Sequence, residues 1–170
     1  MKQEFTSANT SINNKKIPAL YTIAREIFEP DTVNFDIGGG KYDTVTDYLR
    51  GLNVQNLIWD KFNRSEEWNK NVLNTLIKCG GADTVTISNV LNAIKEWEHR
   101  YEVLEMAFAY SKPTASIYIT VYEGDKSGVG RQTKNDCYQL NRTTADYIDE
   151  VSIVFPHVER FGKLIVCSKM

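Results

Sequence analysis

Cysteine and histidine are scarce in this chain of 170 residues, which contains three of the first and two of the second. Cys79, Cys137 and Cys167 are widely spaced and form no CxxC pair, and His99 and His157 are the only histidines. Zinc sites and Ser-His-Asp triads both require residues that the sequence lacks. An odd number of widely spaced cysteines is typical of a reducing compartment, so we expect a cytoplasmic protein.

The chain also lacks a long apolar run and an excess of positive charge. No apolar stretch approaches the ~20 residues that cross a bilayer as a helix, and MKQEFTSANTSINNKK at the start has no apolar core of a secretion signal. The formal net charge is −2, which provides no basic footprint for nucleic acid. We therefore expect neither a membrane span nor a large nucleic-acid surface.

What the sequence does contain is an alternation of strand-like and helix-like segments. Apolar runs of strand length cover residues 33–37, 56–60, 84–88 and 115–122. Amphipathic patterns of helical period cover residues 18–28, 42–52, 65–78, 97–108 and 143–154. This alternation predicts an α/β fold with a Rossmann-like, doubly wound, mostly parallel sheet, whose ligands bind beyond the carboxyl ends of the strands.

The last residues depart from this alternation. HVERFGKLIVCSK reads as two strands that turn at Phe161 and Gly162, and a turn this short joins only antiparallel strands. The sequence thus predicts an antiparallel hairpin at the end of the sheet. It shows no internal repeat and no linker, so we expect a single domain over residues 1–170, in which the segment 1–16 is polar and adaptable.

Three consecutive glycines follow the first predicted strand, in VNFDIGGGKYD. Glycine permits a positive φ and a close approach of ligand to backbone, although a tight strand-to-helix turn would also explain the cluster. A phosphate-binding P-loop requires Ser or Thr after the lysine, and here Tyr42 follows Lys41. A dinucleotide fingerprint requires a small residue where Asp43 stands. The motif that remains is D-x-G-x-G, with Asp36, Gly38 and Gly40.

Together with two later segments, this motif resembles the class I S-adenosylmethionine-dependent methyltransferases. Residues 36–40 (DIGGG), Asp60 at the end of the second strand and SNVLNAI after the third are similar to that family's first, second and fourth motifs. The terminal hairpin is also its signature, and the resemblance covers residues 31–167. It implies an S-adenosylmethionine cofactor and direct transfer of its methyl group to an acceptor.

The chain departs from the family between Asp60 and Asp83. Family members have a helix, a strand and a second helix in this interval, whereas here one helix fills it. We therefore predict six strands rather than seven. The loop that usually contacts adenine after the missing strand is absent, so residues 61–64 would have to supply such contacts.

The resemblance implies a role for each residue of a cofactor site. The glycines would admit the methionyl tail, and Asp36 would attract its ammonium group. Asp60 would bind the ribose hydroxyls, unless it is a solvated strand-end acid or a helix cap. Phe62 would cover adenine or pack in the core, and Asn89 would face the methyl group or cap the next helix. The predicted cofactor-binding residues are Asp36, Gly38, Gly39, Gly40, Asp60, Lys61, Phe62, Ser88 and Asn89.

The methyl acceptor is less evident. SNVLN lacks the Pro-Pro-aromatic run that the superfamily uses to methylate base amino groups. We expect acceptor contacts from the N-terminal segment and from residues 123–137, a long charged loop that would form a lid or an unstructured connection. The predicted catalytic residues are Tyr122 and Glu123, and the predicted substrate-binding residues are Tyr21, Asp125, Arg131 and Tyr138. The acceptor is a small molecule or an exposed group on a macromolecule.

Two other classes of function stay open at this point. The chain could be a non-catalytic module that binds S-adenosylmethionine for regulation, an idea that its small size and missing strand favour. It could also be an enzyme that cleaves S-adenosylmethionine. Binding of the cofactor and of its demethylated product, combined with transfer to an acceptor, distinguishes a methyltransferase from both.

Overall fold

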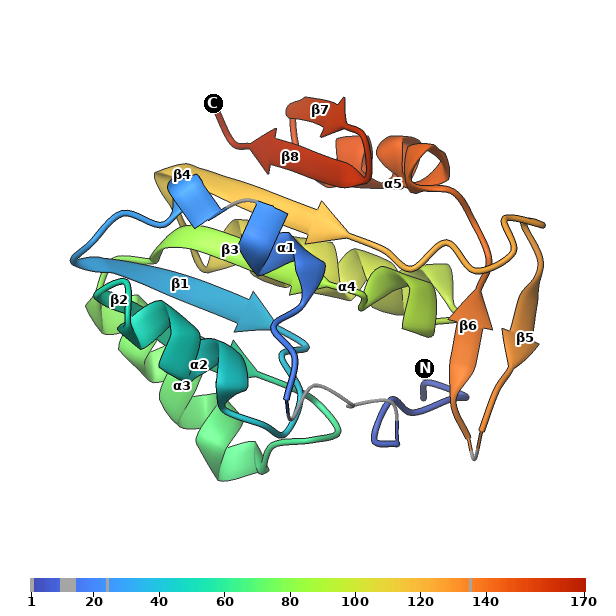
Figure 1. Ribbon diagram of the computed structural model, residues 1–170, viewed down its shortest axis with the longest axis horizontal. Coiled ribbons are helices and arrows are strands. Elements are labelled where there is room, and N and C mark those ends of the chain that lie inside the picture. The colour runs from blue at the N-terminus through green and yellow to red at the C-terminus, as the bar shows by residue number, and fades with distance from the viewer. Residues whose placement is uncertain (1, 10–14, 24, 135) are drawn as a thin grey trace.

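One six-stranded sheet forms the centre of the molecule, with strand order β2-β1-β3-β4-β8-β7 (Figure 1). The computed structural model describes residues 2–9, 15–23, 25–134 and 136–170. The parallel strands are β1 (Thr32–Ile37), β2 (Val54–Trp59), β3 (Ala82–Ser88) and β4 (Ser111–Thr120). At one edge, β7 (His157–Phe161) and β8 (Leu164–Ser168) form an antiparallel hairpin, and β8 pairs with β4. The predicted α/β sheet of six strands and its terminal hairpin are confirmed.

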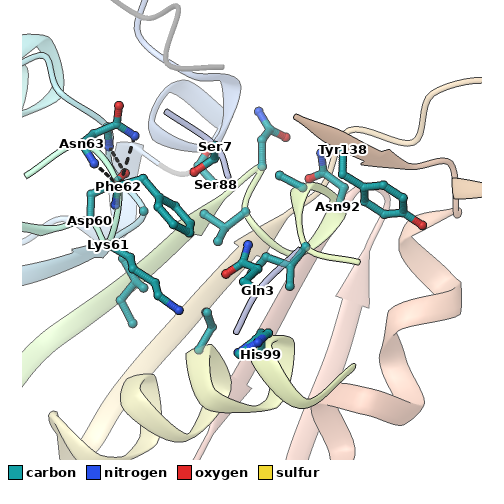
Figure 2. Close-up of a pocket in the computed structure, with 18 of the residues that line it drawn as sticks. Gln3, Ser7, Asp60, Lys61, Phe62, Asn63, Ser88, Asn92, His99 and Tyr138 are labelled. Atoms are coloured by element: carbon teal, nitrogen blue, oxygen red, sulfur yellow. Dashed lines mark hydrogen bonds between the residues drawn. The ribbon is translucent and has the colours of Figure 1, made fainter. Parts of the chain in front are cut away.

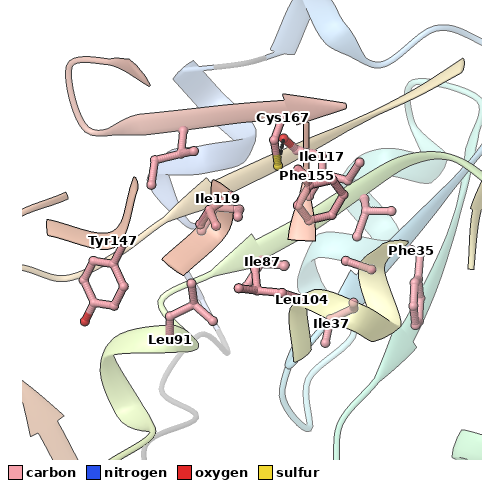
Figure 3. Close-up of a cluster of buried hydrophobic side chains, with 14 of the residues drawn as sticks. Phe35, Ile37, Ile87, Leu91, Leu104, Ile117, Ile119, Tyr147, Phe155 and Cys167 are labelled. Carbon is pink, nitrogen blue, oxygen red and sulfur yellow. Dashed lines mark hydrogen bonds between the residues drawn. The ribbon is translucent and has the colours of Figure 1, made fainter. Parts of the chain in front are cut away.

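Helices cover both faces of this sheet. The short helices α1 (Ala19–Ile23) and α2 (Thr44–Arg50) pack around a small apolar cluster. The larger cluster, part of which Figure 3 shows, includes residues of α3 (Glu66–Lys78), α4 (Trp97–Ala109) and α5 (Ile148–Val154). On β4, Ile117 and Ile119 belong to the larger cluster whereas Tyr118 packs against the smaller one. This follows from strand geometry, because successive side chains point to opposite faces.

A single helix joins β2 to β3. The side chain of Ser65 caps α3 by accepting a hydrogen bond from the Trp68 backbone N–H at 3.1 Å. Val72 and Leu76 of α3 pack into the larger cluster. The prediction that no strand lies between Asp60 and Asp83 is therefore confirmed, since every residue of this interval is described.

Two local expectations, both about helices, need correction. The predicted helix 18–28 ends as α1 at Ile23, and a 3₁₀ turn occupies Arg25–Ile27, with residue 24 outside the described part. The predicted helix 143–154 begins as the 3₁₀ turn Thr144–Tyr147, whose Thr143 and Asp146 form a capping box, before α5. A third 3₁₀ turn, Leu91–Ala93, precedes α4. Such turns are common where a helix begins or ends.

The buried face of α4 is rotated relative to the predicted one. The sequence pattern predicted a stripe of Trp97, Tyr101, Leu104 and Phe108, but the buried residues are His99, Arg100, Leu104 and Ala107. The long charged loop is not an unstructured connection, because a second, two-stranded sheet begins within it. Its strands are β5 (Gly130–Gln132) and β6 (Tyr138–Leu140). Among the described residues, no helix combines the length and the apolar character needed to cross a membrane.

The rotation of α4 is explained by a buried ion pair. The guanidinium of Arg100 donates to both carboxylate oxygens of Glu150 at 2.9 Å, and the two side chains are only 6% and 16% exposed. Arg100 also donates to the carbonyls of Ile94 and Lys95, and Arg142 donates to Glu150 at 2.7 Å. Burial alone would raise the pKa of Glu150, but these hydrogen bonds lower it. The pair fixes α4 against α5.

Replacing Arg100 with Ala should therefore destabilise the protein substantially. The change leaves Glu150 buried with one arginine less, which costs about 3 kcal/mol of the free energy of unfolding. Urea denaturation measures this loss. Arg50→Ala is the matched control, because its pair with Asp47 is 71% and 65% exposed, and pairs of that kind contribute about 0–1 kcal/mol. Equal losses in the two variants would contradict the structural role of Arg100.

Candidate functional site

A cavity of about 670 Å³ opens at the carboxyl ends of the parallel strands. Four strand-end segments line it: residues 38–40 after β1, 60–63 after β2, 88–90 and 92–94 at the end of β3, and Tyr122 after β4. The carboxyl ends of parallel strands meet at one edge, so loops far apart in sequence converge there. The volume is within the range of small-molecule and cofactor sites, about 300–1,000 Å³. The cavity lies at the edge where the sequence predicted a ligand.

Three further elements complete the wall. Helix α4 contributes its first turns, and the β5–β6 sheet contributes Arg131, Thr133, Tyr138 and Gln139. The N-terminal segment contributes Gln3 and Ser7, which face the cavity in Figure 2.

Three contacts hold the N-terminal segment in this position. The Glu4 N–H donates to the Glu96 carboxylate at 2.8 Å, and the Thr6 N–H donates to the Asp136 carbonyl at 2.7 Å. The Phe5 ring stacks on Tyr138, with centroids 5.2 Å apart. The segment and the small sheet therefore pack together on one side of the cavity.

The glycine turn after β1 has no room for side chains. Gly38 has a φ of +74° and Gly40 a φ of +80°, and both values are costly for any other residue. A Cβ atom on Gly38 would lie 2.5 Å from a Val90 methyl carbon, and one on Gly39 would lie 2.6 Å from an Asp36 carboxylate oxygen. The turn exposes backbone to the cavity at a point where only glycine fits.

Asp36 lies under this turn and not in the main cavity. Its carboxylate is buried, and it lines a small second cavity with Tyr21, Ser88 and the first two glycines. Burial raises the pKa of Asp36 to about 6, despite hydrogen bonds from Tyr21 and Asn56 that lower it. A carboxyl group with this pKa changes charge easily near neutral pH.

Asp60 lines the main cavity, and its carboxylate is already engaged by the protein. One oxygen accepts from the Phe62 and Asn63 backbone N–H groups at 3.0 and 2.9 Å and from the Asn63 side chain at 3.1 Å. The other oxygen accepts from the Gly40 N–H at 2.9 Å. An oxygen of a carboxylate accepts about two hydrogen bonds, so this second oxygen keeps one free position. Asp60 is buried and is therefore not a solvated acid, and it does not cap α3, whose N-cap residue is Ser65. Its carboxylate instead connects the loop after β1 to the loop after β2.

The other predicted cofactor residues also border the main cavity. Lys61, Phe62, Ser88 and Asn89 all line it. The Phe62 ring points into the space in Figure 2 and belongs to neither apolar cluster. Asn89 has a φ of +57°. It does not cap the following 3₁₀ turn, because the N-cap residue of that turn is Val90.

Only half of the residues predicted as catalytic or substrate-binding lie at the main cavity. Tyr122, Arg131 and Tyr138 line the cavity. Tyr21 is fully buried, and its hydroxyl is hydrogen-bonded to Thr86 at 2.9 Å. It reaches only the small second cavity.

Glu123 and Asp125 do not line the cavity because other contacts hold them elsewhere. The Glu123 carboxylate accepts from the backbone and hydroxyl of Thr144 at 2.8 and 2.9 Å, and these bonds lower the pKa of Glu123 to about 2. The exposed Asp125 accepts from the Ser127 N–H at 3.0 Å. Both acids stabilise the loop after β4.

A pair that was not predicted from the sequence, His99 and Glu102, lies on the α4 wall. His99 is 4% exposed, and its Nδ1 is 3.0 Å from a Glu102 carboxylate oxygen. The bond to His99 lowers the pKa of Glu102, so Glu102 is ionised at neutral pH and accepts the Nδ1 proton. The Nε2 atom is buried and has no hydrogen-bond partner among the described residues. In neutral His99 this atom therefore carries an unused lone pair.

The spacing of the residues around His99 could have indicated this wall. His99, Glu102, Val103 and Met106 all line the cavity and follow a helical spacing of three and four residues. The prediction for α4 relied on its apolar stripe, and the two histidines counted only as too few for a metal site. Within the described part of the chain, no group of three or more His, Cys, Asp or Glu residues could hold a metal ion.

Amide side chains line the end of the cavity next to the β5–β6 sheet. The Asn92 side chain donates to Gln139 at 3.0 Å and accepts from the Tyr122 N–H at 3.3 Å. Gln139 donates to the Tyr122 carbonyl at 2.9 Å. These bonds connect the end of β4 to the small β5–β6 sheet and hold Tyr122 at the cavity wall.

Solved structures with the same fold are class I S-adenosylmethionine-dependent methyltransferases. The chain is similar to a 1,6-didemethyltoxoflavin-N1-methyltransferase from Burkholderia thailandensis, with a TM-score of 0.64 and 14% identity over 95% of this chain and 82% of that one. It is similar to a TehB-like methyltransferase from Corynebacterium glutamicum, with a TM-score of 0.58 and 12% identity over 95% and 93%. A methyltransferase from Aquifex aeolicus has a TM-score of 0.54 and 12% identity over 88% and 87%.

At these identities the likeness establishes the fold. No protein-family model and no curated protein matches the sequence. The fold class inferred from the glycine motif and the terminal hairpin is thereby confirmed.

The tautomer of His99 provides a direct test of the site geometry. In neutral His99 the proton should be on Nδ1, because ionised Glu102 accepts it. Long-range ¹H–¹⁵N NMR at pH 8 distinguishes the two ring nitrogens, and only His157 gives a second set of signals. Glu102→Ala should produce a mixture of tautomers, whereas Glu98→Ala elsewhere on α4 should leave the spectrum unchanged. A proton on Nε2 in the unaltered protein contradicts this geometry.

Proposed function

We propose that the protein binds S-adenosylmethionine in the main cavity and transfers its methyl group to a small-molecule acceptor. The observation that carries this proposal is the glycine turn, which leaves backbone open to a cavity of about 670 Å³ in a methyltransferase fold. A nucleoside attached to an amino acid requires such a combination: a backbone approach for the amino-acid part and a largely apolar wall for the base.

The residues around the turn suit each part of this cofactor. Gly38 and Gly39 present bare backbone to the cavity, where the methionyl tail can approach it, and the buried carboxylate of Asp36 attracts its ammonium group from below. Asp60 has one free acceptor position for a ribose hydroxyl. Phe62 offers a flat apolar surface to the base.

When bound, S-adenosylmethionine supplies a methyl group that is already activated by the sulfonium charge. The protein then has to align the acceptor and keep water out of the site. The N-terminal segment and the β5–β6 sheet are suited to the second task, since Phe5 and Tyr138 stack next to the cavity. Tyr122, which we place at the acceptor side, is held by the Asn92 and Gln139 amides. We assign no catalytic role to Glu123.

A small acceptor fits this arrangement better than a group on a macromolecule. The acceptor side is bordered by Gln3, Tyr122, Arg131, Tyr138 and Gln139, which come from three different segments. A concave site bordered by three segments, two of which contribute tyrosines, favours a compact, partly aromatic molecule. The Burkholderia thailandensis enzyme supports this choice, since its structure contains bound 1,6-didemethyltoxoflavin and S-adenosylhomocysteine.

Replacement of Gly38 with Val should abolish cofactor binding. The new side chain would collide with Val90, because a Cβ atom alone is already 2.5 Å from the nearest carbon, so the turn and Val90 could not keep their positions at the cavity wall. Calorimetric titration with S-adenosylhomocysteine and S-adenosylmethionine measures the effect. Gly162→Val is the control, because Gly162 also has a positive φ, of +61°, but lies in the β7–β8 turn, where an added Cβ would meet nothing within 4 Å.

The proposal fails if the unaltered protein binds neither molecule. If both bind but no methyl group passes from tritiated S-adenosylmethionine to the small molecules of a cell extract, the chain is a binding module and not a transferase. Release of a cofactor fragment without an acceptor would instead identify a cleaving enzyme.

Binding of S-adenosylhomocysteine should weaken as the pH falls through about 6. The pKa of Asp36 in the free protein is about 6, and only the ionised carboxylate attracts the ammonium group. Affinity is therefore full above pH 7 and falls by about fivefold towards pH 5. Calorimetry across this range, repeated with Asp36→Asn, tests the assignment. The variant should bind more weakly at pH 7 and lose the pH dependence, while Asp47→Asn on the surface of α2 should retain it.

A further inference from the structure

We infer that His99 and Glu102 recognise the 6-amino group of the cofactor's adenine, an assignment that rests on the proposed function. The unused lone pair of His99 Nε2 is the starting point. The atom is buried, it has no partner among the described residues, and its side chain lines the main cavity. Buried polar atoms nearly always have a hydrogen-bond partner. The missing partner is therefore a ligand group that donates a proton.

The environment of His99 selects the kind of donor. Glu102 is ionised and accepts the Nδ1 proton, so in neutral His99 the Nε2 atom is an acceptor and cannot donate in this tautomer. A carbonyl oxygen or an anion of the ligand would face a lone pair. An N–H or O–H group forms a hydrogen bond instead, and an exocyclic amino group provides two N–H donors.

The position of His99 indicates adenine as the source of that amino group. Lys61, in the loop after β2, and Glu102, on α4, both line the cavity. They are close enough for the charge of Lys61 to contribute to the lowered pKa of Glu102, so α4 borders the part of the cavity next to that loop. Figure 2 shows the Lys61 amine extending towards the side where His99 lies. Lys61 is between Asp60, which is proposed for the ribose, and Phe62, which is proposed for the base. A base that follows the ribose along this loop extends towards α4.

The unusual topology makes α4 available for this task. A single helix joins β2 to β3, so no additional strand end lies beyond β2 at this edge of the described sheet. Val103 and Met106 continue the wall next to His99 with apolar side chains. A wall with one acceptor in an apolar surface suits the amino edge of a flat base. The tyrosines, amides and Arg131 at the other end remain for the methyl acceptor.

A double-mutant cycle tests the contact without knowledge of the acceptor. The two ligands are S-adenosylhomocysteine and its analogue with hydrogen in place of the 6-amino group. The two proteins are the unaltered chain and His99→Phe, which keeps a ring but has no acceptor. Calorimetry should give about a five- to tenfold weaker affinity when either partner is removed, and no further loss when both are removed.

The control variant is His157→Phe, which replaces the other histidine on the exposed β7 strand. It should bind both ligands like the unaltered protein. Thermal unfolding shows whether each variant is folded. If His99→Phe does not fold, His99→Leu takes its place, because leucine also has no acceptor, and the unaltered protein must still prefer S-adenosylhomocysteine to the analogue.

The outcomes separate this inference from the proposed function. If S-adenosylhomocysteine binds and the two losses multiply, or if the unaltered protein does not distinguish the two ligands, His99 does not contact the amino group and the inference is wrong. That result includes the case in which His99 serves the methyl acceptor. If the unaltered protein binds neither ligand, the proposed function itself is wrong and the inference falls with it.

Discussion

The carboxylate of Asp60 connects the two loops on which the candidate site depends. It accepts hydrogen bonds from Gly40 in the turn after β1 and from Phe62 and Asn63 in the loop after β2. Arg64 reinforces the connection by donating to the Gly40 carbonyl at 2.8 Å. Loops of this kind usually vary in conformation because they have few contacts of their own. Here a charged acceptor with four donors fixes their relative position, and charge-assisted bonds are the stronger class.

The second support of the site comes from below, on the face of the sheet that α1 and α2 cover. Asn34 donates to Asn56 at 2.8 Å and to Thr86 at 2.9 Å, and Asn56 donates to Asp36 at 3.4 Å. The hydroxyl of Tyr21 completes this buried network at Thr86. Buried polar groups need such partners, and a fully connected network holds its members in one arrangement. Asp36 is thereby kept under the glycine turn, where a lone buried carboxylate would be costly.

Much of the fold could be predicted from the sequence, because its strands and helices have strong local signals. The alternating apolar residues of β4, the Ser65 cap of α3 and the Gly162–Lys163 turn, one residue after its predicted place, are all features of neighbouring residues. The position of the cavity also follows from topology, since parallel strands end at one edge. The glycine motif was informative because two positive φ values and a close contact with Val90 require glycine there. The remaining parts of the site depend on contacts between residues distant in sequence. Glu123 was predicted at the rim from its place after β4, but Thr144 supplies two donors that hold it elsewhere.

The rotation of α4 is another such contact, and it brings His99 to the cavity. The rotation is set by the contact of Arg100 with Glu150, which lies fifty positions later in the chain. A hydropathy pattern cannot reveal this contact, because it treats every arginine as an exposed residue. Arg100 points towards α5 and its ion pair, while the preceding residue lines the cavity. Adjacent residues on a helix lie about 100° apart around its axis, given 3.6 residues per turn. Once Arg100 is fixed by Glu150, the direction of His99 is fixed as well. A buried ion pair between two helices can therefore determine how the binding wall is presented, whatever its net contribution to the free energy of unfolding.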